Sequence, residues 1–362
     1  MAPIKSSLAR TVGKLLGVQK DSDLSLRGDV QSIREIQFSA SGGNVANGLA
    51  PGNGYKYHTF TTPGTLTLSG PPKALEVLMV AGGGGGGAAN STTGTDGGGG
   101  GGAGGLIYVP SYTFSAGDHS ITIGSGGTGA PLPSTPGGPD IASQKGGNTT
   151  WGSLLTAVGG GGGGSGPTGG PADTQAPFGS GGGQGGGGSG THPTDHVGGG
   201  DQPGVSQNIP SPNYQQFGNP GGVADNSGPH SGGGGGGAGG AGGPGNTSDD
   251  RAGGVGKQYP QFAGPLIGLP ALNPLNGYFA GGGAGGGGGP GGDNNITHGA
   301  DRAGGGASNG SGGTPLAGQP AVDYTGSGGG ANSGMWDPGH NGTMGPGGDG
   351  GDGIVIVRYP VS

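Results

Sequence analysis

The chain has no cysteine, so neither a disulfide framework nor a thiolate metal site can hold it together. It also lacks any run approaching the roughly 20 apolar residues that a membrane-spanning helix needs, and we expect no membrane insertion. Arg10 and Lys14 interrupt the only apolar stretch near the start, which argues against a secretory signal. We therefore expect the protein to be made and folded in a cytoplasm.

Charged side chains are scarce, at 9% of residues, and the glutamates are limited to Glu35 and Glu76. No cluster suits nucleophilic or acid–base chemistry, so we expect a non-enzymatic protein that uses no cofactor. Six of the 13 basic residues lie within residues 1–36, and the remainder of the chain is acidic. This distribution lacks the concentrated basic face that nucleic-acid binding requires, and we expect no nucleic-acid partner.

Glycine is what the chain has in abundance, at 109 of 362 residues, together with 30 prolines. Only 27% of residues are hydrophobic, against roughly 45–50% in ordinary globular domains. A core sized for the whole chain is therefore excluded. At most one small β unit can be packed by side chains, and any other ordered part must depend on backbone hydrogen bonds.

Strand-like patterns occur in four ranges, 55–81, 106–123, 150–158 and 353–360. The alternation in YKYHTFT and GTLTLSG predicts half-buried strands, and the nearly continuous apolar run ALEVLMVA predicts a strand covered on both faces. The closing GIVIVRYP is rich in β-branched residues, which favour strands. The fold class we expect is mainly β, with these ranges forming a small β-sandwich-like unit.

Glycine tracts of four to six residues recur along the chain, and two tracts of six follow strands directly, in LEVLMVAGGGGGG and LLTAVGGGGGG. A flexible linker has no reason to be divided into similar lengths or to adjoin buried strands. Glycine can instead form polyproline-II-type helices, whose N–H and C=O groups point sideways toward neighbours, and its lack of a Cβ permits close approach on every side. We expect residues 82–105 and 159–352 to form a packed bundle of such helices with surface loops.

Residues 1–36 are a separate unit in this interpretation, ahead of a glycine-rich body formed by residues 37–362. One face of a short predicted helix carries four apolar residues, Leu8, Val12, Leu15 and Leu16. A helix of about ten residues does not stand alone, so this stripe needs a partner to cover it. The charged stretch that follows is typical of a tether.

Two patterns suggest binding by the body. GGDGGDGIV fits a calcium-binding nonapeptide with Asp349 and Asp352 as ligands, but the match is weak because such repeats work by stacking and this one stands alone. Aromatic residues lie in the segments between the glycine tracts, and loops on a rigid scaffold are where binding is usually located. The candidates for receptor contact are Tyr214, Phe217, Tyr259, Phe262 and Trp336. For each of them, a structural role as a loop anchor is the alternative.

Several segments resemble glycine-rich virion proteins of tailed bacteriophages, especially those of marine bacteria. They are the strand-to-glycine junctions, GGAGGLIYVPSYTFSAGDHSITIGSGGTG and the closing GGDGGDGIVIVRYP. The stretch SSLARTVGKLLGVQKDSDLSLRGDVQS resembles virion-attachment segments of marine phage fibre and appendage proteins. The resemblance implies a structural protein of the virion exterior, a tail fibre or appendage, assembled in the host cytoplasm and joined to other virion proteins through residues 1–36.

In that role the body displays host-recognition loops, and the expected ligand is a bacterial surface glycan or an outer-membrane protein. The segments we expect to carry specificity are 201–220, 256–280 and 332–345. A homo-oligomer, with a trimer favoured, would raise the avidity of weak single contacts. Two alternatives stay open: a purely architectural capsid or tail decoration, and a glycine-lattice protein that binds ice or another surface.

Overall fold

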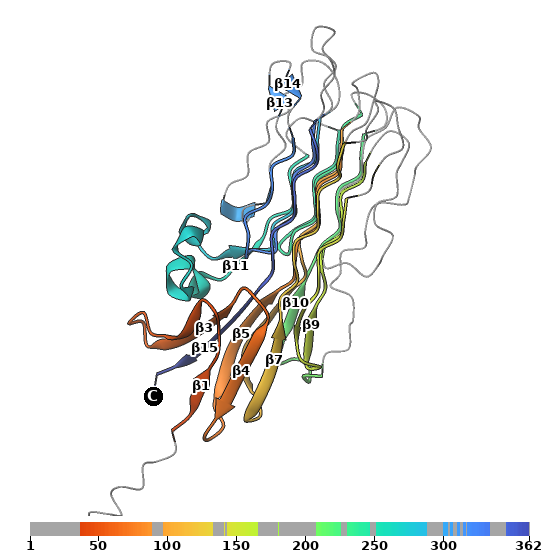
Figure 1. Ribbon diagram of the computed structural model, residues 1–362. Helices are drawn as coiled ribbons and strands as arrows, with labels where there is room; N and C mark the ends of the chain where they lie inside the picture. The colour runs from red at the N-terminus through yellow and green to blue at the C-terminus, as the bar shows by residue number, and fades with distance from the viewer. Residues whose placement is uncertain are drawn as a thin grey trace, which may run out of the picture.

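The computed structural model describes residues 37–88, 97–132, 141, 143–165, 180, 208–225, 230–246, 251–287, 300–302, 305–306, 310–311, 314–315, 317–333 and 345–361. Within these residues the protein is mainly β, and helix is limited to short 3-10 segments. Figure 1 shows two parts that follow one another along the molecule, a unit of packed strands and an array of glycine-rich tracts that extend from those strands. The expected fold class is confirmed, whereas the helix predicted within residues 1–36 lies outside the described residues.

One layer of the strand unit is a five-stranded antiparallel sheet in the order β1-β4-β7-β8-β9. Its strands are β1 (Ser39–Ser41), β4 (Gly64–Ser69), β7 (Gly117–Thr122), β8 (Thr149–Trp151) and β9 (Leu155–Ala157). In β4, Leu66 and Leu68 are buried and the residues between and beside them are more exposed. The alternation in the sequence therefore turns one face of this sheet inward.

The second layer is a six-stranded antiparallel sheet in the order β10-β6-β5-β15-β3-β2. Its strands are β10 (Gln215–Phe217), β6 (Leu106–Thr113), β5 (Ala74–Val80), β15 (Ile354–Pro360), β3 (Tyr55–Phe60) and β2 (Ala46–Leu49). The strand latest in sequence, β15, lies in the middle of the sheet, where Val355 is opposite both Met79 of β5 and Phe60 of β3. Residues almost 300 positions apart thus form the centre of this layer.

The main core lies between the two sheets, which together form a sandwich. Leu66 and Trp151 come from the five-stranded sheet, and Val77 and Met79 come from the six-stranded one, all of them fully or almost fully buried. The Trp151 indole stacks on Phe114 with ring centroids 4.6 Å apart. A small number of large side chains therefore fills the space between the layers.

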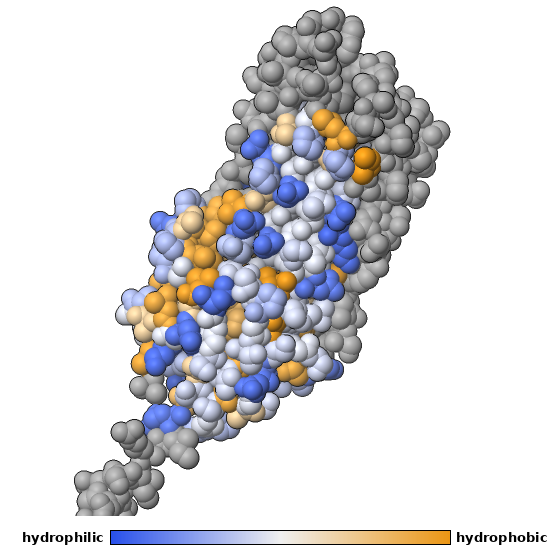
Figure 2. Space-filling model, in the orientation of Figure 1, coloured by the Kyte–Doolittle hydropathy of each residue, from blue (hydrophilic) through white to orange (hydrophobic). Residues whose placement is uncertain are grey.

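The outer face of the six-stranded sheet is covered by a segment that the sequence pattern did not predict. It contains β11 (Lys257–Gln258), η2 (Pro260–Phe262), η3 (Gly264–Ile267), η4 (Pro270–Leu275) and β12 (Tyr278–Phe279). Phe262 and Ile267 are completely buried against Leu78 and Ile356 in a second apolar cluster. β5 and β15 are consequently buried on both faces, as their continuous apolar runs predicted. Figure 2 shows further apolar residues gathered on the surface at the side of the molecule where this segment lies. The remaining short elements are η5 (Ala300–Arg302), β13 (Gly310–Ser311) and β14 (Thr314–Pro315).

Beyond the sandwich, glycine-rich tracts pack side by side in an array that we call the glycine lattice. Its tracts include residues 81–88, 97–105, 124–130, 143–148, 159–165, 230–238, 280–287, 326–333 and 345–353. Their backbone N–H groups donate to carbonyl groups of other tracts, at N···O distances near 2.9 Å. Backbone hydrogen bonds therefore replace side-chain packing as the main interaction in this part of the protein.

The 82–87 tract shows the geometry of the lattice most completely. Its successive N–H groups donate in rotation to three neighbouring tracts, 143–148, 345–353 and 97–105. Gly84 donates to Gly102 and Gly87 donates to Gly99, so the same neighbour is reached again after three residues. A period of three residues is that of the polyproline-II helix.

The carbonyl groups of the 82–87 tract accept in the same rotation from three further tracts, 159–165, 124–130 and 326–333. This tract is therefore surrounded by six others. A Cβ added at each of its glycines would lie far inside van der Waals contact with a carbonyl oxygen of a neighbouring tract. Glycine is required at these positions for close approach, as the lattice hypothesis predicted.

Candidate functional site

The body has two ends with different surroundings. We call one of them the base, and it is the end of the sandwich that carries Gln37 and Val361. There the Val361 N–H donates to the carbonyl of Gly54 at 2.9 Å. The other, which we call the far end, is where the lattice tracts finish, and there the Ala88 N–H donates to the Ser165 hydroxyl at 3.2 Å. Six lattice residues at about 3.1 Å rise place this end roughly 20 Å beyond the strands. Figure 1 shows the C-terminus at the base and β13 and β14 toward the far end.

At the edge of the lattice, side chains accept or donate hydrogen bonds in place of a further tract. The Asp349 carboxylate accepts from the Gly129 N–H and the Asp352 carboxylate accepts from the Gly126 N–H, both at 2.8 Å. Both pairs are spaced three residues apart, which matches the period of the lattice. Other side chains that bond to tract backbone in this way are Asn148, Asn219 and Arg302.

This arrangement gives the weak calcium candidates, Asp349 and Asp352, a structural role. The nearby Asp323 has a raised pKa because it is partly buried and because the negative charges of Asp352 and Asp349 disfavour its ionised form. Within the part of the chain that the structure describes, no three histidine, aspartate or glutamate side chains are grouped to hold a metal ion. The geometry favours a lattice-edge role for the two aspartates over metal binding.

Replacing Asp349 with alanine is expected to lower the free energy of unfolding by about 0.5–1 kcal/mol, because the Gly129 N–H loses its acceptor. Asparagine keeps an Oδ1 acceptor and should restore at least half of that loss. Chemical denaturation of the two variants measures the difference. Val322→Ala is the control, because this side chain is 41% exposed and the change should cost less than about 0.5 kcal/mol. Equal losses in the alanine and asparagine variants would contradict the edge role.

The structure separates the predicted receptor-contact residues into different environments. Tyr214 and Phe217 are half-buried against the two cores, and the Phe217 ring has the Lys257 ammonium 4.2 Å from its centroid. Tyr259 and Phe262 are buried in the second cluster, where they fix the 3-10 segment to the sheet. We therefore correct the prediction that Tyr259 and Phe262 contact a receptor, because their burial gives them the alternative role of loop anchors. Trp336 and the apolar stripe of residues 8–16 lie outside the described residues.

A polar network joins the sheet to η2 and has Glu76 at its centre. The Glu76 carboxylate accepts from Arg358 Nε at 2.6 Å, from the Tyr108 hydroxyl at 2.8 Å and from Gln261 Nε2 at 3.1 Å. Burial, and then the hydrogen bond to Glu76, raise the pKa of Tyr108 to about 12, so its hydroxyl remains a donor at physiological pH. The Arg358 guanidinium also lies over the Tyr55 ring at 4.2 Å. The network is a structural clamp that sequence reasoning missed, because its members are between 32 and 282 positions apart.

These observations define a class of protein, a two-layered β sandwich whose strands continue into a lattice of glycine-rich tracts. A family model described as a glycine-rich domain matches residues 60–360, and the chain belongs to that family. Among curated proteins, none matches the chain. Across the described ranges there is no helix with the length and apolar character needed to cross a membrane.

Proposed function

We propose that this protein is a non-enzymatic structural component of a phage virion exterior, a tail fibre or appendage that presents host-recognition loops on a rigid glycine-rich scaffold. Residues 1–36 join it to other virion proteins. A bacterial surface glycan or outer-membrane protein is the ligand class, and a homo-oligomer, with a trimer favoured, supplies avidity. The sequence resemblance of the glycine junctions and of the N-terminal stretch supports this assignment.

The observation that carries the proposal is the separation of the two ends of the body. Gln37, which follows the attachment segment, lies at the base, and the tracts finish at the opposite end of the lattice. A protein with its attachment point at one end and the ends of its tracts at the other is suited to present residues away from the particle. Loops on a rigid scaffold are a common location for recognition.

The second support is the stiffness of the connection between the ends. Each interior tract is bonded through its backbone to several others, so it cannot bend without breaking hydrogen bonds to its neighbours. Each such bond contributes about 0.5–1.5 kcal/mol net, and the contributions add over many residues. A scaffold of this kind fixes the residues at which its tracts end, and a pre-organised attachment for contact residues lowers the entropy cost of binding.

The burial of the described residues favours some of the predicted specificity segments over others. The 256–280 segment contains η2–η4 and their buried Phe262 and Ile267, so it belongs to the fold of the body. Tyr214 and Phe217 remain as partly exposed candidates within the 201–220 segment. Residues 334–344, which include Trp336, lie outside the described residues and remain the candidate segment to exchange.

Deleting residues 1–36 tests the attachment role. The truncated chain is expected to keep the melting temperature of the full chain and to be absent from purified particles, in which immunogold electron microscopy locates the full-length protein on the exterior. The matched control is an exchange of residues 334–344 for a glycine–serine spacer, which should leave incorporation intact and reduce adsorption to cells at least about tenfold.

Two results would contradict the proposal in different ways. Normal packaging of the truncated chain would remove the attachment role of residues 1–36. Normal adsorption by particles that carry the folded exchange variant would remove the receptor role of that segment and favour the purely architectural alternative.

A further inference from the structure

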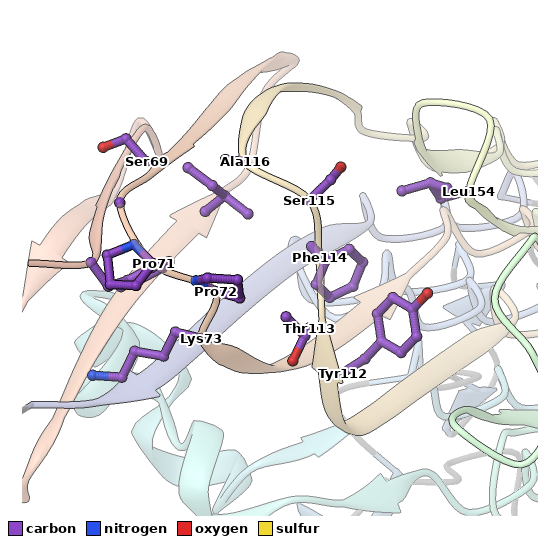
Figure 3. Close-up of a pocket in the computed structure, with 13 residues that line it drawn as sticks. Ser69, Pro71, Pro72, Lys73, Tyr112, Thr113, Phe114, Ser115, Ala116 and Leu154 are labelled. Atoms are coloured by element: carbon purple, nitrogen blue, oxygen red, sulfur yellow. The ribbon is translucent and has the colours of Figure 1, made fainter. Parts of the chain in front are cut away.

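A cavity of about 340 Å³ opens at the base, between the turns that connect the two sheets. Its walls come from the β4–β5 connection with Pro71 and Lys73, the end of β6 and the following turn with Tyr112 and Phe114, and from Phe38 and Leu154. Figure 3 shows these elements surrounding the space, with the Phe114 and Tyr112 rings on one side and the two prolines on the other. The cavity therefore reaches from the surface to the edge of the main core.

One part of the cavity is apolar and rigid. Phe114 is only 4% exposed, and it is held between Trp151, on which it stacks at 4.6 Å, and Tyr112, which it meets edge-on at 5.0 Å. Leu154 packs against the same core. Because neighbouring side chains fix these groups, the space between them is already formed before any ligand enters. An apolar group that entered it would gain buried area at little cost in side-chain entropy.

The other part of the cavity carries a positive charge. Lys73 is the only charged side chain among the described residues that line it. Its ammonium lies 5.8 Å from the centroid of the Phe38 ring and 5.5 Å from that of the Tyr359 ring. In Figure 3 the ammonium points away from Tyr112 and Leu154, so the charge and the apolar pocket lie at opposite sides. A ligand that fits has an apolar group at one side and a negative charge at the other.

The cavity also lies where the attachment segment joins the body. Gly70, which lines the cavity, has φ +85°, and an added Cβ there would meet the carbonyl group of Gln37. The backbone of Gln37 therefore runs directly over the cavity rim, and Phe38 forms part of its wall. A partner bound through residues 1–36 would be brought close to this opening.

We propose that the base cavity receives an apolar side chain, preferably aromatic, of the virion protein to which this chain is attached, with an adjacent carboxylate of that partner paired to Lys73. This inference deepens the proposed function and rests on it. A protein partner fits better than a free metabolite, because the volume is at the small end of ligand pockets, which run to about 1,000 Å³, and because the opening faces the attachment end. The cavity then acts as a second contact that fixes the orientation of the appendage.

Binding of capped dipeptides to the purified full-length chain tests the chemistry directly, with saturation-transfer NMR observed on the dipeptide. N-acetyl-Phe-Asp-amide is expected to bind, with the strongest saturation on its phenyl ring. An alanine in place of the phenylalanine should abolish the signal. A lysine in place of the aspartate should weaken binding about 2- to 5-fold, which is the range that one exposed ion pair provides.

Variants with matched controls locate the binding at the cavity. Ala116 is an exposed residue that lines the cavity, so Ala116→Trp should fill it and abolish binding, whereas Ser120→Trp places the same ring on an exposed position of β7 and should leave binding unchanged. Lys73→Gln should weaken binding as the dipeptide change does. Lys257→Gln alters another lysine held over an aromatic ring, away from the cavity, and should have no effect. Melting curves confirm that each variant is folded.

Incorporation into particles tests the identity of the partner. The amount of the folded Ala116→Trp variant in particles should be at least about fivefold lower than that of the Ser120→Trp variant. Equal incorporation of the two would overturn the proposal, and so would dipeptide binding that survives in Ala116→Trp. Phenylacetate that binds as tightly as the dipeptide would indicate a free small molecule and would also overturn it. Absence of the wild-type chain from particles would instead contradict the proposed function. The dipeptide measurements would then still test whether the cavity binds an apolar group next to a carboxylate.

Discussion

Replacing Gly84 with alanine is expected to lower the free energy of unfolding by at least about 4 kcal/mol. The added methyl group would lie far inside contact with the carbonyl of Gly161. The backbone cannot move aside, because Gly84 also donates to Gly102 at 2.8 Å and accepts from Gly329 at 2.9 Å. Overpacking of side chains in ordinary cores costs about 1–3 kcal/mol, and here the obstructing atoms belong to main chain. The stabilisation of about 0.4–1 kcal/mol that alanine brings through the unfolded state does not offset this.

The matched control is Gly240→Ala. An added Cβ at Gly240 first meets Cγ2 of Val255 at 3.2 Å, and that side chain can turn away. This variant should therefore stay within about 1 kcal/mol of the wild type. Gly235→Ala, whose Cβ would meet the Gly101 carbonyl, should repeat the result of Gly84→Ala in another tract. Denaturant unfolding and protease resistance measure all three, and equal stabilities would restore the linker interpretation of the glycine tracts.

Phe262→Ala should lower the free energy of unfolding by about 3–5 kcal/mol, the usual loss for a buried phenylalanine. Phe262 is completely buried and joins η2 to the outer face of the six-stranded sheet. Its ring also lies 5.4 Å from the Arg358 guanidinium of the Glu76 network. Loss of the ring therefore removes packing and opens the clamp that holds the 3-10 segment.

Leu49→Ala is the control for this variant, because Leu49 is 36% exposed at the end of an edge strand and should cost less than about 0.5 kcal/mol. Thermal unfolding followed by near-ultraviolet circular dichroism reports both changes. A loss below about 1 kcal/mol in Phe262→Ala would mean that the segment is held by other contacts and would reopen a binding role for its aromatic residues.

The sequence predicted the strands well where a side-chain pattern exists. β3, β4, β5 and β15 lie within the ranges expected from alternation or from continuous apolar runs. The three-residue period of the lattice was also predicted, because glycine can adopt the polyproline-II conformation and its lack of a Cβ permits close approach on every side. Both predictions depend on local composition, which a single sequence displays directly.

The rest depends on contacts between distant residues. The three residues of β10 gave no strand pattern, and they are a strand because they pair with β6, which is about 100 positions earlier. The PQFAGPLIGLPALNPL stretch reads as a proline-rich loop, yet it covers a sheet face with Phe262 and Ile267. Asp349 and Asp352 resembled a calcium motif in the sequence because only their spacing was visible there. The structure shows that their carboxylate oxygens accept from backbone N–H groups of a distant tract.

The position of β15 in the middle of its sheet determines when this protein can fold during synthesis. β5 leaves the ribosome about 270 residues ahead of β15, and at about 5–20 residues per second the interval is on the order of tens of seconds. Throughout that time β5 and β3 have no partner between them, and the 82–87 tract lacks the neighbouring 345–353 tract. Until β15 and the 345–353 tract emerge, the facing edges of β3 and β5 therefore stay unpaired in the nascent chain, and chaperone binding and aggregation compete with folding.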